Sequence, residues 1–193
     1  MHTIQAVIPF LRRNAFALMT VALFTGLFFV AILQLMYEAK VFVDQQIAQD
    51  IEQLSKIFTK IDADCRIVTF AQQKNAIDFL NVKKFAGTTV GSMQLMFPDR
   101  WKGPYLTESL SVFGKPYMIV RTKTGFFIAP PEGTRLGNGK LVGTDILLDE
   151  TANVSALMQD ARGLKSADKA LAAKLYTTGV RGPMLQTILP EEE

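Results

Sequence analysis

Residues that commonly carry out catalysis are scarce in this chain. Among its 193 residues His2 is the only histidine, and it precedes a long apolar segment. The chain after that segment therefore has no imidazole base, no Ser-His-Asp arrangement and no histidine ligand for a metal ion. The glycine-containing stretch 137–140, GNGK, is too short for a P-loop and indicates a turn. The sequence predicts that this protein is not an enzyme.

The remaining reactive side chains have ordinary structural explanations. Cys65 is the single cysteine, so the chain can form no internal disulfide. We expect it to be a small buried residue rather than an activated thiol, because no histidine lies near it in sequence. Asp62 and Asp64 could act as a carboxylate pair, but they fit equally well as solvated groups at the end of a helix.

Residues 15–36, AFALMTVALFTGLFFVAILQLM, contain no charged residue. At a rise of about 1.5 Å per residue, a helix of this length crosses a hydrocarbon layer of roughly 30 Å. The segment is therefore predicted to be one transmembrane helix in contact with membrane lipid. Within it Ala22 and Gly26 form a small-xxx-small pair, which could let a helix of another integral membrane subunit approach closely.

A cleaved signal peptide is the alternative interpretation of this segment. Signal peptides have an apolar core of about 7–15 residues followed by small residues, whereas this core is longer and Tyr37 lies where a small residue is needed. Arg12 and Arg13 are similar to a twin-arginine signal, but they are explained more simply as the positive flank of a span. No acidic residue precedes them, so the positive-inside rule places residues 1–14 in the cytoplasm. We expect a single-pass inner-membrane protein with a periplasmic C-terminal domain.

The charge balance gives no reason to expect a nucleic-acid partner. The formal net charge is +3, and Arg12 and Arg13 account for two of the 21 basic residues, which leaves 19 against 18 acidic residues. Nucleic-acid binding calls for a clustered basic surface.

Roughly 155 residues remain beyond the span, enough for one domain with its own core.

Helical periodicity continues beyond the span. No glycine or proline occurs between residues 37 and 61, and Asp44 and Asp50 fall on polar faces. Apolar residues recur three and four positions apart at Ile47, Ile51, Leu54, Phe58 and Ile61. We predict an amphipathic helix over 37–61 that continues the span and packs on the chain's own sheet, with a coiled coil as the alternative. Before the span, a short interfacial helix from Pro9 and a cytoplasmic stub both remain open.

Residues 62–180 are predicted to form an exterior α+β domain. We expect a strand over 65–70, a short helix over 71–85, a hairpin over 116–129 and a third strand over 141–148. Gly125 would supply a positive φ at the turn of the hairpin. Two C-terminal helices should follow: one capped by Asp149 or Thr151 and ending near Gly163, the other capped by Ser166 and ending at Gly179. The tail 181–193 could contact a partner or the domain itself.

Two short sequence blocks resemble a known family. The first is Trp-x-Gly-Pro-Tyr-Leu at residues 101–106, and the second is aromatic-Gly-x-Pro-Tyr at residues 113–117. With a long helix before a small antiparallel sheet, they resemble the major pseudopilins of type II secretion, which are related to type IV pilins. The resemblance covers residues 100–146, and Phe113 stands where the family usually has Trp. Trp101 is expected to be a buried residue that caps the sheet; the alternative is that Trp101 is exposed and, with Tyr105, is a candidate partner-contacting residue.

The sequence also departs from that family. Prepilins carry a glycine before the cleavage site, then phenylalanine, then a glutamate five residues into the mature chain. Around Pro9 and Phe10 there is no such glycine, and Glu38 is the first acidic residue. Prepilin processing and the usual filament pairing are therefore not expected. The sequence indicates a pseudopilin-like domain used as a fixed membrane subunit.

The resemblance further implies a calcium site. Major pseudopilins bind calcium in a loop after the sheet, where Asp145 lies in this chain. Glu132 and Asn138 are the other carboxylate or amide side chains between residues 130 and 146. Because calcium takes about 6–8 oxygen ligands, these three side chains with backbone carbonyls are its candidate ligands. The alternative is that Asp145 is a turn residue and that no cofactor is bound.

Two functional hypotheses follow. The first is a structural subunit whose span packs beside other membrane subunits and whose exterior domain contacts proteins, within a secretion apparatus or another membrane complex. The second is a membrane-anchored sensor that binds calcium, a small ligand or a peptide. Self-association is left open by both.

Overall fold

The longest element of the protein is helix α2, Ala15–Cys65, in a computed structural model that describes residues 15–178. The predicted interfacial segment 1–14 and the tail 181–193 lie outside the described residues. The chain divides into two compact units, Met1–Phe42 and Val43–Glu193. Most of the predicted amphipathic part of α2, from Val43 onward, thus belongs to the same compact unit as the sheets.

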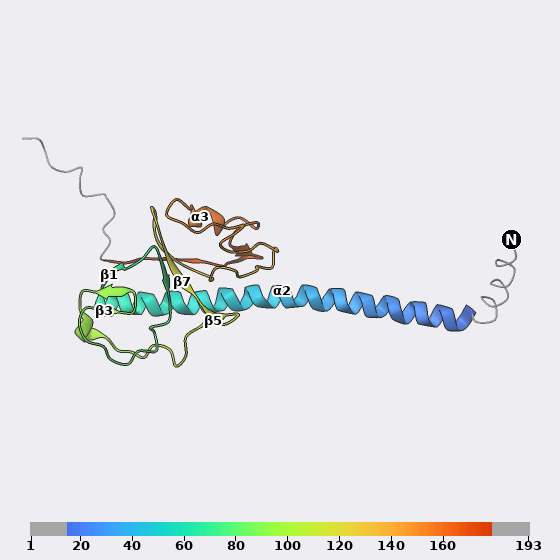
Figure 1. The fold of residues 1–193 in the computed structure, drawn as a ribbon, viewed down its shortest axis with the longest axis horizontal. Helices are drawn as coiled ribbons and strands as arrows, with labels where there is room; N and C mark the ends of the chain where they lie inside the picture. Colours follow the sequence, from blue (N-terminus) through green and yellow to red (C-terminus); the bar gives the residue numbers. More distant parts are fainter. Residues whose placement is uncertain (1–14, 179–193) are drawn as a thin grey trace, which may run out of the picture. The chain divides into compact units, whose positions relative to one another are not determined.

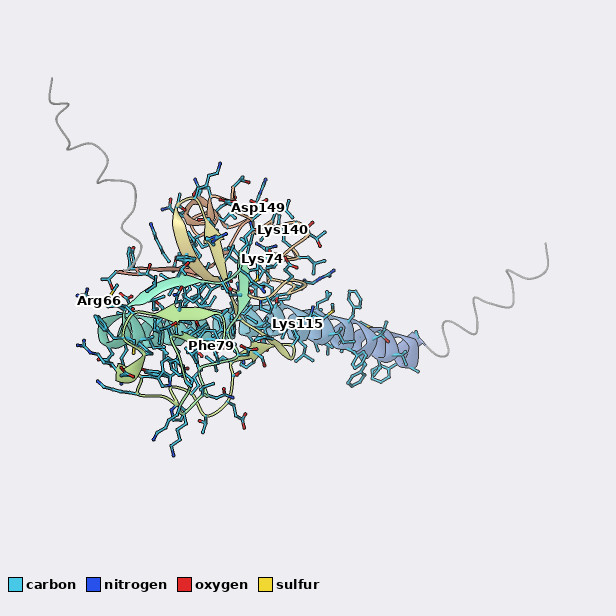
Figure 2. All side chains as sticks on the ribbon, turned by 60° about the vertical axis from the view of Figure 1, so that its left-hand side comes forward. Arg66, Lys74, Phe79, Lys115, Lys140 and Asp149 are labelled. Atoms are coloured by element: carbon cyan, nitrogen blue, oxygen red, sulfur yellow. The ribbon has the colours of Figure 1, made fainter. Side chains whose placement is uncertain are left out.

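In the first unit, α2 exposes apolar side chains around its circumference. It is long and apolar enough to cross a membrane, and none of its most apolar window is buried. Phe24 and Phe28 are about two-thirds exposed, at 66% and 68%, and Figure 2 shows such side chains projecting from this part of the helix. Ala22 is exposed, and a Cβ atom added at Gly26 would meet nothing within 4 Å. Within the described residues, this small-residue face is open.

In the second unit, α2 buries one stripe against its own domain. The stripe is the predicted one, with each member no more than 2% exposed: Ile47, Ile51, Leu54, Phe58 and Ile61. The ring of Phe58 meets those of Phe70 and Phe79 edge-on, with centroids 6.3 and 6.4 Å apart. The amphipathic helix is confirmed, and it ends at Cys65, four residues later than predicted.

Short antiparallel strands form the rest of this unit. A three-stranded sheet has the order β1-β4-β3, with β1 at Ile67–Phe70, β3 at Thr89–Val90 and β4 at Met93–Leu95. A four-stranded sheet has the order β11-β8-β7-β2, with β2 at Lys74–Ala76, β7 at Met118–Thr122, β8 at Gly125–Ala129 and β11 at Ala173–Leu175. Two hairpins complete it: β5 at Ser111–Val112 with β6 at Lys115–Pro116, and β9 at Lys165–Ser166 with β10 at Lys169–Ala170. The predicted α+β class is confirmed.

Strand β8 is buried on both of its faces. Phe126 points to the face where its ring lies 5.0 Å from that of Phe70, and Phe127 points to the opposite face, yet neither is more than 4% exposed. Helix α3, Val154–Leu157, has Val154 fully buried. In Figure 1, β11 is drawn between α2 and α3. A central strand buried on both faces explains the continuous apolar run of β8.

Several predicted helices are wrong. Residues 71–85 contain strand β2 and a loop, because residues 74–76 pair with β7. The helix expected from a cap at Asp149 or Thr151 to near Gly163 shrinks to α3, and its cap is Asn153, whose side chain accepts the Ala156 N–H at 3.1 Å. Asp149 instead accepts the Thr151 hydroxyl at 2.8 Å, which holds the pKa of Asp149 below its ordinary value.

The second C-terminal helix and the third strand are also wrong. Residues expected to be helical from Ser166 onward form β9, β10 and β11, because β11 completes the sheet along β8. Residues 141–148 form turns with isolated bridges, in which Val142 pairs with Ile146. The hairpin is confirmed: β7 and β8 join at Thr122 and Gly125, and Gly125 has φ 123°.

Buried carboxylates of α2 hold the helix to distant loops. Asp44 accepts the N–H of Gly137 at 2.8 Å and is 3% exposed, although it was expected on a polar face. Asp62 accepts the Ile67 N–H at 2.9 Å and the Thr178 hydroxyl at 2.8 Å, so its assignment as a solvated helix-end group is wrong. Asp62 thereby satisfies the buried N–H of Ile67, and Asp44 the partly buried N–H of Gly137.

Tyr117 makes a further link, and it predicts sensitivity to alkali. Its hydroxyl donates to Asp50 at 2.8 Å, and burial together with that carboxylate raises the pKa of Tyr117 well above its ordinary value. Because the folded state keeps its proton while the unfolded phenol titrates near pH 10, stability from this group is present below about pH 10 and is lost above it. The free energy of unfolding should fall by up to about 1.4 kcal/mol per pH unit there.

Urea titrations of the full chain in detergent at a series of pH values measure the free energy of unfolding. Tyrosinate absorbance of the folded protein reports the ionisation of its tyrosines. The Tyr117→Phe variant should be less stable at neutral pH but should lose the added alkaline dependence. Ionisation of Tyr117 near pH 10 in the folded protein would contradict the prediction.

Candidate protein-contact site

The loop that carries the first family-like block is fixed to a second loop of the same unit. The 3-10 turn η1, Pro98–Arg100, precedes it. The N–H groups of Tyr105 and Leu106 then both donate to the carbonyl of Leu80, at 2.8 and 3.2 Å. Because Tyr105 and Leu106 are both anchored to Leu80, the backbone of residues 101–106 is held in one arrangement, which also restricts its side chains.

Trp101 is half-buried in this arrangement. Its ring meets those of Phe85 and Tyr105 edge-on, with centroids 5.5 and 4.8 Å apart. Its Nε1 donates to the carbonyl of Val82 at 3.0 Å. Trp101 therefore packs on the loop that follows β2 rather than capping the sheet, and its remaining exposed surface is compatible with contact to a partner.

Gly103 is required for this close approach. A Cβ atom at Gly103 would lie 2.3 Å from both Trp101 Nε1 and the backbone oxygen of Val82. A backbone atom cannot move aside as a flexible side chain can, so Gly103→Ala must displace the indole or the loop. We expect it to cost about 1–3 kcal/mol of stability, as overpacking does.

Fluorescence measures the Gly103→Ala prediction directly, because Trp101 is the only tryptophan of the chain. The emission should shift to longer wavelength as the indole becomes more exposed. Gly87→Ala is the matched control, because a Cβ atom there would meet nothing within 4 Å, although its φ of 85° carries a strain of its own. An unchanged emission spectrum in Gly103→Ala would refute the arrangement.

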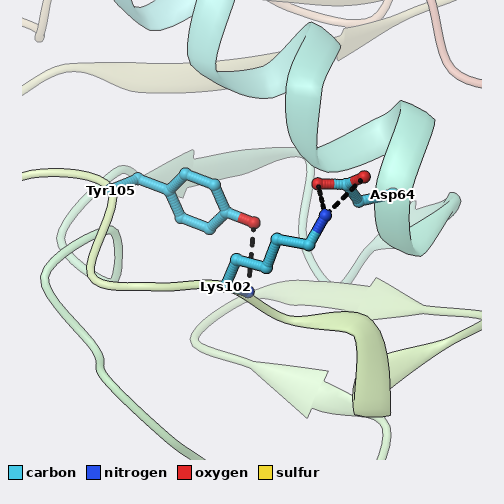
Figure 3. A network of polar contacts seen from close by, with 3 residues as sticks. All are labelled: Asp64, Lys102 and Tyr105. Carbon is cyan, nitrogen blue, oxygen red and sulfur yellow. Dashed lines mark hydrogen bonds and ion pairs between the residues drawn. The ribbon is translucent and has the colours of Figure 1, made fainter.

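Charged and phenolic groups join the loop to the end of α2. Lys102 Nζ lies 3.2 Å from both carboxylate oxygens of Asp64, and the Lys102 N–H donates to the Tyr105 hydroxyl at 3.4 Å (Figure 3). Burial raises the pKa of the Tyr105 phenol. An exposed ion pair such as Lys102–Asp64 contributes only about 0.2–1 kcal/mol to the stability of the fold. The main role of these groups is therefore to position the loop.

Tyr105 also borders a groove along α2. The groove has a volume of about 400 Å³, and its other lining residues are Gln49, Glu52, Gln53, Lys56 and Ile57. Glu52 and Lys56 form an ion pair at 2.6 Å within it. Polar helix residues beside an aromatic loop make a surface that can contact a protein. In the sequence, these helix residues belong to the polar face of the predicted amphipathic helix.

The three candidate calcium ligands have separate partners. Glu132 pairs with Lys74 and its backbone carbonyl accepts from Lys115 at 3.0 Å; Figure 2 labels both lysines. Asn138 donates to the carbonyl of Gly163 at 3.1 Å, and Asp145 accepts the N–H of Leu141 at 2.8 Å as a turn residue.

Among residues 15–178 no group of three His, Cys, Asp or Glu side chains is placed to hold a metal ion. The calcium site therefore stays a prediction from the resemblance, while the turn contact of Asp145 is observed.

Cys65 is buried, and burial raises the pKa of its thiol. A thiol with a raised pKa is a poor nucleophile at neutral pH, in keeping with its packing in the core.

No protein-family model, curated protein or solved structure matches this chain.

Proposed function

We propose that this protein is a non-enzymatic, single-pass structural subunit of a larger membrane or secretion complex. The span would pack beside other integral membrane subunits, and the exterior pseudopilin-like domain would contact proteins. In this proposal residues 1–14 are cytoplasmic, the span lies in the inner membrane and the domain is periplasmic.

One observation carries the proposal: the apolar helical segment, of which no part is buried, and the core helix of the domain are a single element, α2. A removable signal peptide would be a separate piece, whereas here the same helix continues into residues that the domain buries, beginning with Asp44 and Ile47. This continuity supports a permanent anchor. The shared plan of long helix and antiparallel sheet supports the pseudopilin-like assignment.

The test is purification of the uncleaved protein from membranes in mild detergent, with mass spectrometry of its N-terminus and of every protein that stays bound. We expect unrelated integral membrane subunits in stoichiometric amounts and a chain that still begins at Met1 or His2. A protein trimmed near Phe10 and accompanied by pilins would refute the fixed-subunit assignment. A lone protein that gains thermal stability with calcium would favour the sensor.

A matched pair of variants tests the role of the span. Gly26→Ile fills the open small-residue face and should reduce co-purification of the other membrane subunits. Ala17→Ile adds a similar side chain nine residues away, which is the opposite side of a helix with 3.6 residues per turn, and should leave co-purification unchanged. Equal effects of the two variants would contradict packing through Ala22 and Gly26.

A further inference from the structure

The backbone of β7 determines which way the neighbouring strands direct their hydrogen-bonding groups. Arg121 donates its N–H to the carbonyl of Gln73 at 2.8 Å, on the side of β2 and away from β8. Because these directions alternate along a strand, Val120 must bond to its partner Phe127 on β8. By the same alternation, Phe126 directs its N–H and C=O away from β7 and toward β11.

The outer edge of β11 consequently has free backbone groups. Phe126 is paired with Leu175, and Ile128 with Ala173, so these pairs hold β11 to β8. Lys174 lies between them and must direct its N–H and C=O outward. β11 is the last strand of its sheet, and within the described residues no strand pairs with this edge. An unpaired edge is a template for another strand.

A cationic cavity adjoins this edge. Its volume is about 470 Å³, and it is lined by the turn between β7 and β8 and by residues 174–177. Arg121, Lys123 and Lys174 all line it, and none of them forms an ion pair with an acidic residue of the described chain. Tyr176 is 81% exposed, and Lys174 Nζ lies 5.8 Å from the centroid of its ring.

The acidic residues near this cavity do not neutralise the three cations. Glu150 approaches through its backbone, whose carbonyl accepts the Lys123 N–H at 2.9 Å. Asp62 is buried, and its oxygens already accept from Thr178 and Ile67. That contact with Thr178 also fixes the chain just after β11, so the edge is held in place.

We propose that the outer edge of β11 and the adjoining cavity bind an extended acidic segment of a partner protein. The segment adds a strand to the sheet through the outward N–H and C=O of Lys174. Its carboxylates contact Lys174 and Lys123, and Arg121 adds positive charge to the same cavity. The site rests on the proposed function only in that its occupant is a protein.

Two independent features select this ligand. The open edge requires an extended backbone with alternating donors and acceptors, which a phosphate or a lipid headgroup lacks. The three cations form no ion pair within the described chain, so charge complementarity favours a strand with acidic side chains over a neutral or basic one.

The test measures binding of a fluorescent, end-blocked peptide of alternating glutamate and valine to the full chain in detergent micelles. A peptide of alternating lysine and valine is the control ligand. The acidic peptide should bind, and its affinity should fall as salt rises, because salt screens exposed charges. Binding of the basic peptide with equal affinity would overturn the proposal.

Variants separate the charge from the edge. Replacing Arg121, Lys123 and Lys174 together by Gln should weaken binding about five- to thirtyfold, given the modest strength of each exposed ion pair. Lys83→Gln with Lys84→Gln removes exposed charge elsewhere and should have no effect. Lys174→Pro removes the outward N–H without breaking a bond to β8 and should weaken binding more than Lys174→Gln. Equal affinities of Lys174→Pro and Lys174→Gln would overturn strand addition.

Two further outcomes would assign the site to another occupant and overturn the proposal. One is binding only after removal of residues 181–193, which would identify the chain's own acidic tail as the occupant. The other is displacement of the peptide by phosphatidylglycerol vesicles but not by unlabelled peptide. Peptide binding without co-purified membrane subunits would contradict the proposed function but support this site. Co-purified membrane subunits without peptide binding would support the proposed function but overturn this site.

Discussion

Replacing Phe58 by alanine should destabilise the protein by about 3–5 kcal/mol, the usual cost of truncating a buried phenylalanine. The side chain of Phe58 is 1% exposed, and its ring meets those of Phe70 of β1 and Phe79 of the loop that follows β2. Removal leaves a cavity where the helix, the three-stranded sheet and the loop converge. No single neighbour can fill that cavity without leaving its own contacts.

Urea unfolding of the full chain in detergent, followed by the fluorescence of Trp101, measures this change. Thr59→Ala is the matched control: it is the next residue of α2, it is exposed, and its hydroxyl bonds only to the Ser55 carbonyl of its own helix, at 2.8 Å. We expect less than about 0.5 kcal/mol for that control. A loss below about 1 kcal/mol for Phe58→Ala would mean that the amphipathic stripe does not pack as described.

Replacing Asp62 by alanine should cost about 2–4 kcal/mol, because several donors lose a buried charged acceptor at once. Asp62 is 7% exposed and accepts the Ile67 N–H at 2.9 Å, together with the Thr178 N–H at 3.1 Å and hydroxyl at 2.8 Å. It therefore joins the end of α2 both to the start of β1 and to the segment after β11. The amides that it leaves behind would be partly buried without partners.

Asp64 supplies the comparison for Asp62. It lies two residues further along α2 but pairs with Lys102 at 3.2 Å near the surface. Asp64→Ala should cost no more than about 1 kcal/mol. Amide hydrogen exchange adds a local measurement, since the Thr178 N–H should exchange faster in Asp62→Ala and not in Asp64→Ala. Similar losses in the two variants would contradict the role assigned to Asp62.

The sequence by itself determined the features that depend on local periodicity. The charge-free run of residues 15–36 predicts a helix of membrane-spanning length, and the spacing from Ile47 to Ile61 predicts the stripe that α2 buries. The hairpin of β7 and β8 was also predictable, because a glycine at the turn and apolar residues on either side are a local signal.

Tertiary structure decided the C-terminal half of the domain. Residues 170–175, ALAAKL, have high helix propensity, yet Ala173 to Leu175 form β11 because the edge of β8 offers backbone partners and a buried position for Leu175. Lys74 to Ala76 similarly pair with β7 against the helical pattern of their neighbours. Sheet completion is a long-range gain that no local window contains.

The polar contacts were decided in the same way. Asp44 and Asp62 have the sequence surroundings of solvated helix residues, but loops some 90 and 116 positions away bring backbone donors to them. Arg121 and Lys174 are likewise distant in sequence and meet at one cavity only because β11 lies beside β8. Periodicity determines what a single element can bury, whereas the pairing of distant strands determines which charged groups gather at a site.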